Sequence, residues 1–139
     1  MSSLIAKIDH IGIAVRDLEK AMRTYEEAFG LVAKAVEEVE DFKVKICFIP
    51  VGEALVEFLE PTGPDSDFHR YIEEKGEAIH HIAFRVSNID LVLDRLKKTG
   101  IPLQDQEPRP GGGGARVAFI EPSAINNVVI ELVERLEDL

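Results

Sequence analysis

DHIGIAVRDLEKAMRTYEEAFGL, residues 9–31, recurs in a related form as HHIAFRVSNIDLVLDRLKKTGI, residues 80–101. In each copy, a short apolar run with the two-residue period of a β-strand leads into a run with the 3.6-residue period of an amphipathic helix. A repeat of this length indicates two copies of one supersecondary unit.

Capping residues mark the ends of the two predicted helices. In the first copy, Asp17 is the predicted N-cap and Gly30 ends the helix. In the second copy, Ser87 and Asp90 resemble a capping box, and Gly100 ends the helix. Each predicted strand is therefore followed directly by its helix.

The segments after the two helices match more loosely. FKVKICFIPVGEALVEFLEP, residues 42–61, and ARVAFIEPSAINNVVIELVE, residues 115–134, each have the pattern of strand, turn and strand. One more strand is expected between helix and hairpin in each copy, near residues 32–39 and 103–107. Each half then has the order strand, helix and three strands.

The predicted fold class is α+β, with two tandem βαβββ modules. Module one covers about residues 5–61, a linker with a short helix about 64–76, and module two about 77–135. A module of roughly 60 residues buries little surface by itself, so we expect the two modules to share a core. Residues 1–139 are therefore predicted to form a single domain.

Composition limits the class of protein. Hydrophobic residues make up 45% of the chain and charged residues 30%, and no apolar run approaches the ~20 residues that a membrane span needs. The first residues lack the apolar core of a signal peptide, which predicts a cytoplasmic protein with no membrane partner. The net charge of −10 argues against a nucleic-acid partner, which would require a basic stripe. The single cysteine, Cys47, lies in an apolar run and is interpreted as a small buried residue.

Two histidines lie at equivalent positions of the repeat. His10 shares its predicted strand face with small residues, and His81 shares its face with Ala83, whereas the alternate faces are apolar. Small neighbours leave room beside each imidazole for something other than side chains. His80 is different, because it lies on the apolar face and corresponds to Asp9 in the first copy. We expect His80 to form hydrogen bonds at the strand end.

The closing strands of the two modules each carry one glutamate, Glu57 and Glu131, among apolar residues. A carboxylate on such a strand is expensive to bury unless it meets a cation. Together with His10 and His81, the two carboxylates form a donor set that suits a divalent metal. The alternative is that each histidine is capped or half exposed and each glutamate lies on a solvated face.

Four consecutive glycines, residues 111–114, lie in the segment EPRPGGGGARVAF. The segment lacks the Gly-Lys-Ser/Thr ending of a nucleotide P-loop. It is either a flexible connection or a loop whose bare backbone closes over a ligand, with Arg109 and Arg116 close enough in sequence to meet anionic groups.

The combination of LEPTGPDS (residues 59–66), GEAIHHIAF (76–84) and EPRPGGGG (107–114) resembles the methylmalonyl-CoA epimerases of the vicinal oxygen chelate superfamily. The resemblance covers almost the whole chain. The opening DHIGIAV is common across the superfamily and less specific.

The resemblance implies a partly closed, cup-shaped barrel around one divalent metal ion. The metal-ligand positions of the family correspond to His10, Glu57, His81 and Glu131, and Glu57 is a glutamine in some members. Cobalt is the expected metal, while manganese, nickel and zinc suit the same donor set. The implied partner is an acyl-CoA substrate, and the implied assembly is a homodimer.

The implied activity is the interconversion of (2R)- and (2S)-methylmalonyl-CoA by proton abstraction and return at the α-carbon through a metal-stabilised enolate. Glu131 is the first acid/base candidate. Lys45 aligns with a glutamate proposed as the partner base in some members, so this assignment departs from the family pattern. The residues expected to contact substrate are Arg85, Arg109, Gly112, Gly113 and Arg116.

Other functions of the same scaffold remain open from the sequence. A glyoxalase I, or lactoylglutathione lyase, shares the size, the repeat and a His/Glu/His/Glu set. A metal-dependent dioxygenase would use a smaller ligand set, and a small-molecule binding or resistance protein would need no metal. The segments LEPTGPDS and GEAIHHIAF favour the epimerase.

Overall fold

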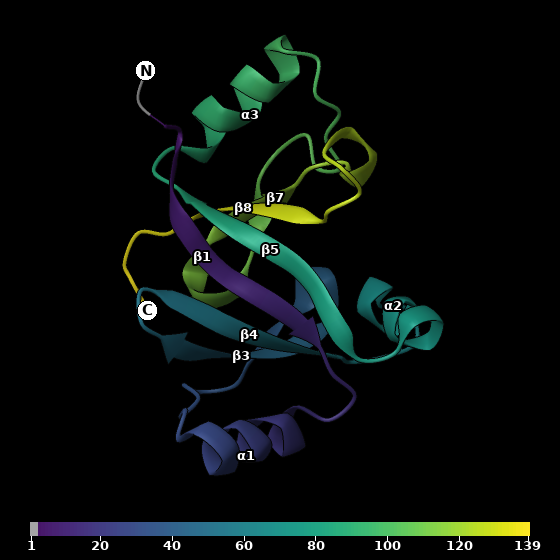
Figure 1. Ribbon diagram of the computed structural model, residues 1–139. Helices are drawn as coiled ribbons and strands as arrows, with labels where there is room; N and C mark the ends of the chain where they lie inside the picture. Colours follow the sequence, from purple (N-terminus) through teal and green to yellow (C-terminus); the bar gives the residue numbers. More distant parts are fainter. Residues whose placement is uncertain (1–2) are drawn as a thin grey trace. The chain divides into compact units, whose positions relative to one another are not determined.

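The computed structural model describes residues 3–139 and contains the two predicted βαβββ modules (Figure 1). A helix, α2, lies between them in the chain, as the linker pattern predicts, so the α+β fold class is confirmed. The strands are β1 (Ile5–Ala14), β2 (Glu37–Val39), β3 (Val44–Val51), β4 (Ala54–Pro61), β5 (Ala78–Val86), β6 (Arg109–Pro110), β7 (Arg116–Phe119) and β8 (Ile130–Glu134), and the helices are α1 (Leu18–Phe29), α2 (Asp67–Lys75) and α3 (Ile89–Lys98).

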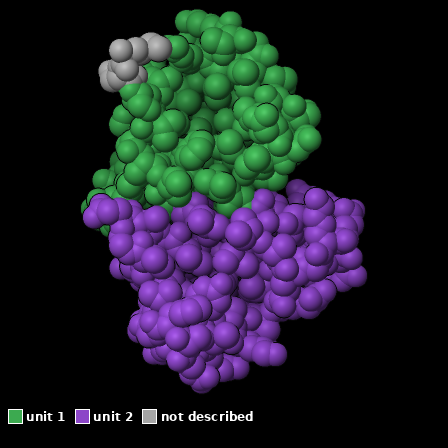
Figure 2. All heavy atoms as spheres, in the orientation of Figure 1, with its two compact units in different colours: residues 1–9, 81–139 green, residues 10–80 purple. Residues whose placement is uncertain are grey.

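The chain divides into two compact units (Figure 2). Their boundaries fall inside strands β1 and β5. One unit is formed by His10–His80, so it includes the linker helix α2. The other joins the chain up to Asp9 with His81–Leu139. Each unit therefore contains most of one module plus a strand segment that the repeat alone would assign to the other module.

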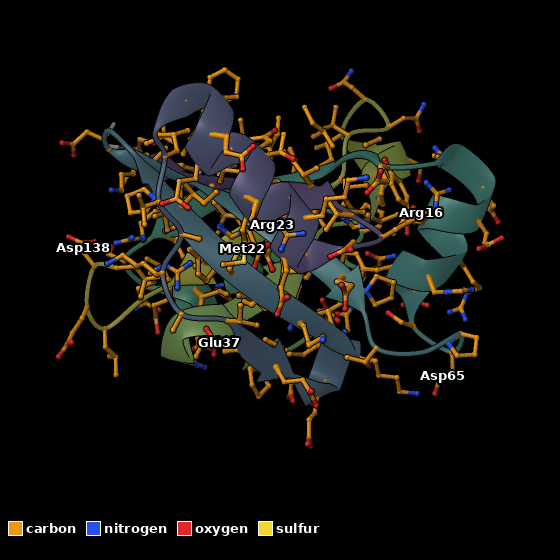
Figure 3. The ribbon with its side chains drawn as sticks, turned by 90° about the horizontal axis from the view of Figure 1, so that it is seen from below. Arg16, Met22, Arg23, Glu37, Asp65 and Asp138 are labelled. Atoms are coloured by element: carbon orange, nitrogen blue, oxygen red, sulfur yellow. The ribbon has the colours of Figure 1, made fainter. Side chains whose placement is uncertain are left out.

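In the unit 10–80, the strand order is β2-β3-β4-β1. Strand β1 pairs in parallel with β4, and β3 pairs antiparallel with β4. Helix α1 covers one face, where its residues Leu18 and Met22 pack against Cys47 of β3 and Phe58 of β4. Met22 is labelled in Figure 3. Cys47 is fully buried, which raises the pKa of its thiol to about 11 and confirms its interpretation as a small buried residue.

The opposite face of the same sheet has its own apolar core. Phe48 of β3 and Leu55 and Leu59 of β4 are buried there together with Phe68 of α2. Ser66 is the N-cap of α2, and its hydroxyl accepts a hydrogen bond from the backbone N–H of Phe68. Residues on this face of β1 and β4 are therefore enclosed by apolar side chains.

In the other unit, the strand order is β5-β8-β7-β6. Strands β5 and β8 are parallel, and β7 and β8 are antiparallel, so the arrangement repeats that of β1, β4 and β3. Helix α3 packs through Val92 and Leu93 against Val86 of β5 and Leu132 of β8. The apolar strand face of each repeat thus packs under the helix of the same repeat.

The helix ends agree with the predicted caps in one case and differ in the other. Asp17 caps α1 through a hydrogen bond from the Lys20 backbone N–H, and Gly30 ends the helix with φ +70°. For α3 the capping-box prediction is wrong, because Asn88 is the N-cap and accepts from the Leu91 backbone N–H. Its side chain accepts from the Leu91 amide, one residue beyond the Asp90 amide that a Ser87 cap would have bound.

The two intermediate strands are shorter than predicted. Only Glu37–Val39 of the expected region 32–39 is a strand. In module two, strand β6 lies at Arg109–Pro110, beyond the expected residues 103–107. Within the expected range, Leu103 forms an isolated bridge to Ile120.

Among the described residues, no helix is long and apolar enough to cross a membrane.

Candidate functional site

A buried histidine and a buried glutamate face each other on β1 and β4. The Nε2 of His10 lies 3.2 Å from Oε1 of Glu57, and the two residues are 2% and 6% exposed. The parallel register sets Glu57 beside Gly12, so its carboxylate is on the His10 face of β1. The ring of Phe48 meets the imidazole edge to face, with 5.6 Å between centroids.

The other unit contains the same construction on β5 and β8. The Nε2 of His81 lies 3.3 Å from Oε1 of Glu131, and these residues are again 2% and 6% exposed. Glu131 is the register partner of Ala83, a small residue like Gly12 in the first pair. The Phe119 ring lies 5.6 Å from the imidazole, also edge to face. The sequence repeat is therefore a repeat of a buried histidine–carboxylate pair.

The burial of these pairs argues for a charged partner. A carboxylate enclosed by apolar side chains is stable when a cation or a protonated group lies next to it. Two imidazole nitrogens and several carboxylate oxygens are donors that first-row divalent metals accept. The four residues His10, Glu57, His81 and Glu131 thus have the chemistry and the burial of metal ligands, which excludes the solvated-face alternative for both glutamates.

His80 has a different environment from its neighbour His81. Its ring packs against Phe68 and Tyr71 of α2, with centroid distances of 4.5 and 4.8 Å. The hydroxyl of Tyr71 donates to the carbonyl oxygen of Ile79, which ties the same helix to the start of β5. His80 therefore joins α2 to β5, on the strand face opposite to that of His81.

Lys45, the predicted second acid/base group, contacts a carboxylate of the neighbouring strand. Its ammonium nitrogen is 3.4 Å from a carboxylate oxygen of Glu60, and the side chain is 46% exposed. Lys45 and Glu60 are register partners, and Glu57 is three residues from Glu60 on the same strand. Because side chains alternate between faces, Lys45 lies on the sheet face opposite to Glu57. Its neighbour Ile46 lies on the same face as the Glu57 carboxylate.

The three arginines predicted to contact substrate all have carboxylate partners. Arg109 lies 3.3 Å from Asp105, and Arg116 contacts both Asp90 and Glu134 at 3.1 and 3.2 Å. Hydrogen bonds to these two carboxylates raise the pKa of Arg116. An anionic ligand would therefore compete with these carboxylates for the guanidinium groups of the arginines.

Arg85 is bound by two carboxylates at once. Its Nε donates to Asp9 at 2.7 Å, and its Nη1 donates to Asp138 at 2.6 Å. Burial by itself lowers the pKa of Arg85, but the hydrogen bonds to Asp138 and Asp9 outweigh it and raise the pKa. The same contact lowers the pKa of the exposed Asp138, which is labelled in Figure 3.

The glycine-rich segment is a compact turn rather than an extended connection. Gly112–Gly114 form a short 3-10 segment in which Gly113 and Gly114 have φ of +69° and +73°. A Cβ at Gly111 would lie 2.6 Å from Cγ1 of Val117. These positions require glycine for backbone conformation and for close packing.

The sequence interpretation missed one buried charged group near the first pair in the chain. Asp9, next to His10, is 1% exposed and also contacts Arg135. The available signal in the sequence was Asp9 at the start of the apolar run HIGIAV and Arg135 at the end of the apolar run VVIELVE. Sequence alone does not show which of several cations such a carboxylate meets.

The family model of the Glyoxalase/Bleomycin resistance protein/Dioxygenase superfamily matches residues 9–119. The chain belongs to this superfamily. This superfamily member is 34% identical over 131 residues to the ethylmalonyl-CoA/methylmalonyl-CoA epimerase of Cereibacter sphaeroides, covering 93% of this chain and 98% of the relative. It is 39% identical over 128 residues to the uncharacterized protein YqjC of Bacillus subtilis, covering 92% and 91% of the two chains.

A solved superfamily structure has the same fold. A substituted form of Streptomyces coelicolor methylmalonyl-CoA epimerase, in complex with 2-nitronate-propionyl-CoA, matches with a TM-score of 0.92 at 30% identity. The match covers 96% of this chain and 97% of that chain. The likeness confirms the fold that the repeat and the family segments predict.

Proposed function

We propose that this superfamily member is a metal-dependent methylmalonyl-CoA epimerase. The observation that carries the proposal is the duplicated buried pair, His10 with Glu57 and His81 with Glu131. Its support comes from the epimerase relative and the epimerase structure with an acyl-CoA analogue. Four buried donors of this type have no evident structural task, since an apolar core of the same size would be at least as stable.

The proposed metal ligands are His10, Glu57, His81 and Glu131, which would hold one divalent ion. Cobalt is the proposed metal, and manganese, nickel or zinc would suit the same nitrogen and oxygen donors. When bound, the ion would act as a Lewis acid toward the thioester carbonyl and the carboxylate of the substrate. Phe48 and Phe119, which each pack on one imidazole, would hold the ring planes and exclude water.

The reaction needs groups that remove and return one proton. The C–H bond between the thioester and the carboxylate of methylmalonyl-CoA breaks, and its electron pair is delocalised into the enolate. A proton returned to the other side of that carbon gives the opposite configuration, so nothing is consumed. Glu131 is the proposed acceptor on one side.

The second acid/base group is not Lys45 in our proposal, because that side chain points to the other sheet face. Glu57 takes this role better, since it is the carboxylate that the repeat places opposite a histidine in the same way as Glu131. A carboxylate near a bound substrate is a suitable general base for an acidic α-proton.

The remaining parts of the proposal concern substrate and context. The residues proposed to contact the acyl-CoA are Arg85, Arg109, Gly112, Gly113 and Arg116. The protein is proposed to act in the cytoplasm as a homodimer, with all 139 residues forming one domain.

Deuterium exchange tests the function directly. Methylmalonyl-CoA supplied as one epimer in D2O with the cobalt-loaded protein should take up deuterium at the α-carbon, measured by NMR, and become a mixture of the (2R) and (2S) forms, followed as a change in circular dichroism. Glu131→Gln should slow exchange by about 10²-fold or more, the usual contribution of a positioned acid or base.

The same assay separates the competing functions. Turnover of the methylglyoxal–glutathione adduct without any exchange into methylmalonyl-CoA would make the protein a glyoxalase. Binding of small ligands with neither reaction would make it a binding or resistance protein. Glu73→Gln, a change on the exposed side of α2, is the matched carboxylate control and should leave exchange unchanged.

A further inference from the structure

The guanidinium of Arg135 links a buried carboxylate to the glycine loop. Arg135 follows β8, and its side chain is 1% exposed. Its Nε and Nη2 donate to the two carboxylate oxygens of Asp9 at 3.0 and 2.9 Å. Its Nη1 donates to the carbonyl oxygen of Gly112 at 2.9 Å. The bidentate contact fixes the plane of the guanidinium, and this plane fixes where Nη1 points.

The anchor of this contact lies deep in its unit. The Asp9 side chain is fully buried, and it also accepts from Nε of Arg85 at 2.7 Å. The Nη1 of Arg85 donates to a carboxylate oxygen of Asp138. Two carboxylates thus balance two guanidinium groups, and Asp9 is the buried carboxylate that Arg85 and Arg135 share.

The loop lies directly against the guanidinium. A Cβ on Gly113 would be only 3.0 Å from Nη1 of Arg135, and the φ of Gly113 is +69°. The backbone of this loop therefore packs closely against the guanidinium of Arg135. Glycine gives the loop many accessible conformations, so a side chain that selects one of them reduces the entropy lost when a ligand binds.

We propose that Arg135, held by Asp9, is a positioning residue that sets the Gly111–Gly114 loop in the conformation that receives the acyl-CoA. The proposal rests on the proposed function for the identity of the ligand. The anchoring itself concerns the protein without ligand. Arg135 touches neither substrate nor reacting atoms in this proposal, so its effect should appear in binding rather than in the proton transfer.

Two measurements on Arg135→Met test this inference. Amide hydrogen exchange of residues 111–115 in the ligand-free protein should accelerate by about tenfold, while β8 keeps its protection. The KM for methylmalonyl-CoA should rise by about tenfold with kcat within about threefold, because a binding conformation is lost and the reacting groups stay in place. A merely structural role would lower both protections together and would not separate KM from kcat.

Other variants guard against failure of Arg135→Met to fold. Arg135→Lys keeps the charge but cannot bind Asp9 bidentately while reaching Gly112, so it should give a smaller effect in the same direction. Gly113→Ala leaves the Asp9 contact intact and should disturb the loop by the close approach of its Cβ. Arg70→Met, which removes an exposed Arg–Asp pair on α2, is the control and should change neither readout.

The outcomes are distinguishable from failure of the proposed function. Unchanged exchange at residues 111–115 in Arg135→Met and Arg135→Lys overturns the anchoring, whatever the activity. Faster loop exchange with an unchanged KM overturns the role in acyl-CoA binding. A wild-type protein without epimerase activity refutes the proposed function and with it the ligand, while the exchange data still decide whether Arg135 anchors the loop.

Discussion

At the scale of single residues, the two adjacent histidines of β5 have opposite surroundings. His81 is buried beside Glu131, whereas the ring of His80 packs between aromatic residues of α2. Strand alternation accounts for this difference, because successive side chains point to opposite faces. The pair therefore offers an internal comparison in which one position is a proposed metal ligand and its neighbour is not.

Replacing each histidine by alanine should separate metal binding from packing. His81→Ala should reduce cobalt bound to the purified protein by about tenfold or more and abolish α-proton exchange, because one ligand is lost. His80→Ala should retain most of the metal and lose stability through the contacts to Phe68 and Tyr71. Metal analysis by mass spectrometry and thermal unfolding are the two measurements.

Equal loss of metal in both variants would contradict the assignment of the two faces. His69→Ala provides the control for the removal of an imidazole, because His69 lies on α2 at 3.8 Å from Glu73 and outside the buried pairs. This variant should change neither the metal content nor the exchange rate.

The sequence predicted the four buried donors but not the partners of the charged residues around them. The His/Glu set could be found because it occurs twice at equivalent positions of the repeat. Asp9 with Arg135 could not, because the two lie 126 positions apart and the residue that corresponds to Asp9 in the repeat is His80, which carries no carboxylate. Lys45 was assigned by its alignment with a family position, and such an alignment does not show that its side chain contacts Glu60 on the sheet face opposite to Glu57.

At the scale of elements, the sequence predicted the three helices well and the short strands poorly. Helix signals combine periodicity with caps, and Asp17 and Gly30 are found where they were expected. Strand β2 has three residues and β6 only two, too few to show a period. Their positions depend on pairing with β3 and β7, which local sequence does not encode.

The corrected start of α3 leads to a paired test. Asn88→Ala should lower the free energy of unfolding by about 1 kcal/mol, because its side chain caps the Leu91 amide. Ser87→Ala should change it by less than about 0.5 kcal/mol, since this residue is exposed and lies one position before the cap. Denaturant unfolding monitored by circular dichroism gives both values, and a larger loss in Ser87→Ala would restore the original capping-box prediction.

At the scale of the whole molecule, each of the two units contains one histidine–glutamate pair. His10 and Glu57 belong to the unit 10–80, and His81 and Glu131 to the other. The epimerase proposal requires the two pairs to ligate the same ion, so the number of ions per chain follows from it.

Metal titration decides between shared and separate ligation. We expect one cobalt ion per chain and a rise in Tm when the metal is added, because the ion binds the folded state. Glu57→Ala and Glu131→Ala should each weaken binding of that single ion. Two ions per chain, with each variant losing only one of them, would show that the pairs act separately.

The division of β1 between the two units also affects the order in which the units can fold during synthesis. The unit 10–80 is continuous, so all its residues have been synthesised once His80 is complete. The other unit begins with the first strand segment and must wait for His81–Leu139 before Asp9 meets its arginines. A C-terminal fragment cut at the linker would therefore keep Arg85 and Arg135 and lack the Asp9 carboxylate that binds both. The second module of the repeat thus depends on a carboxylate that the first module supplies.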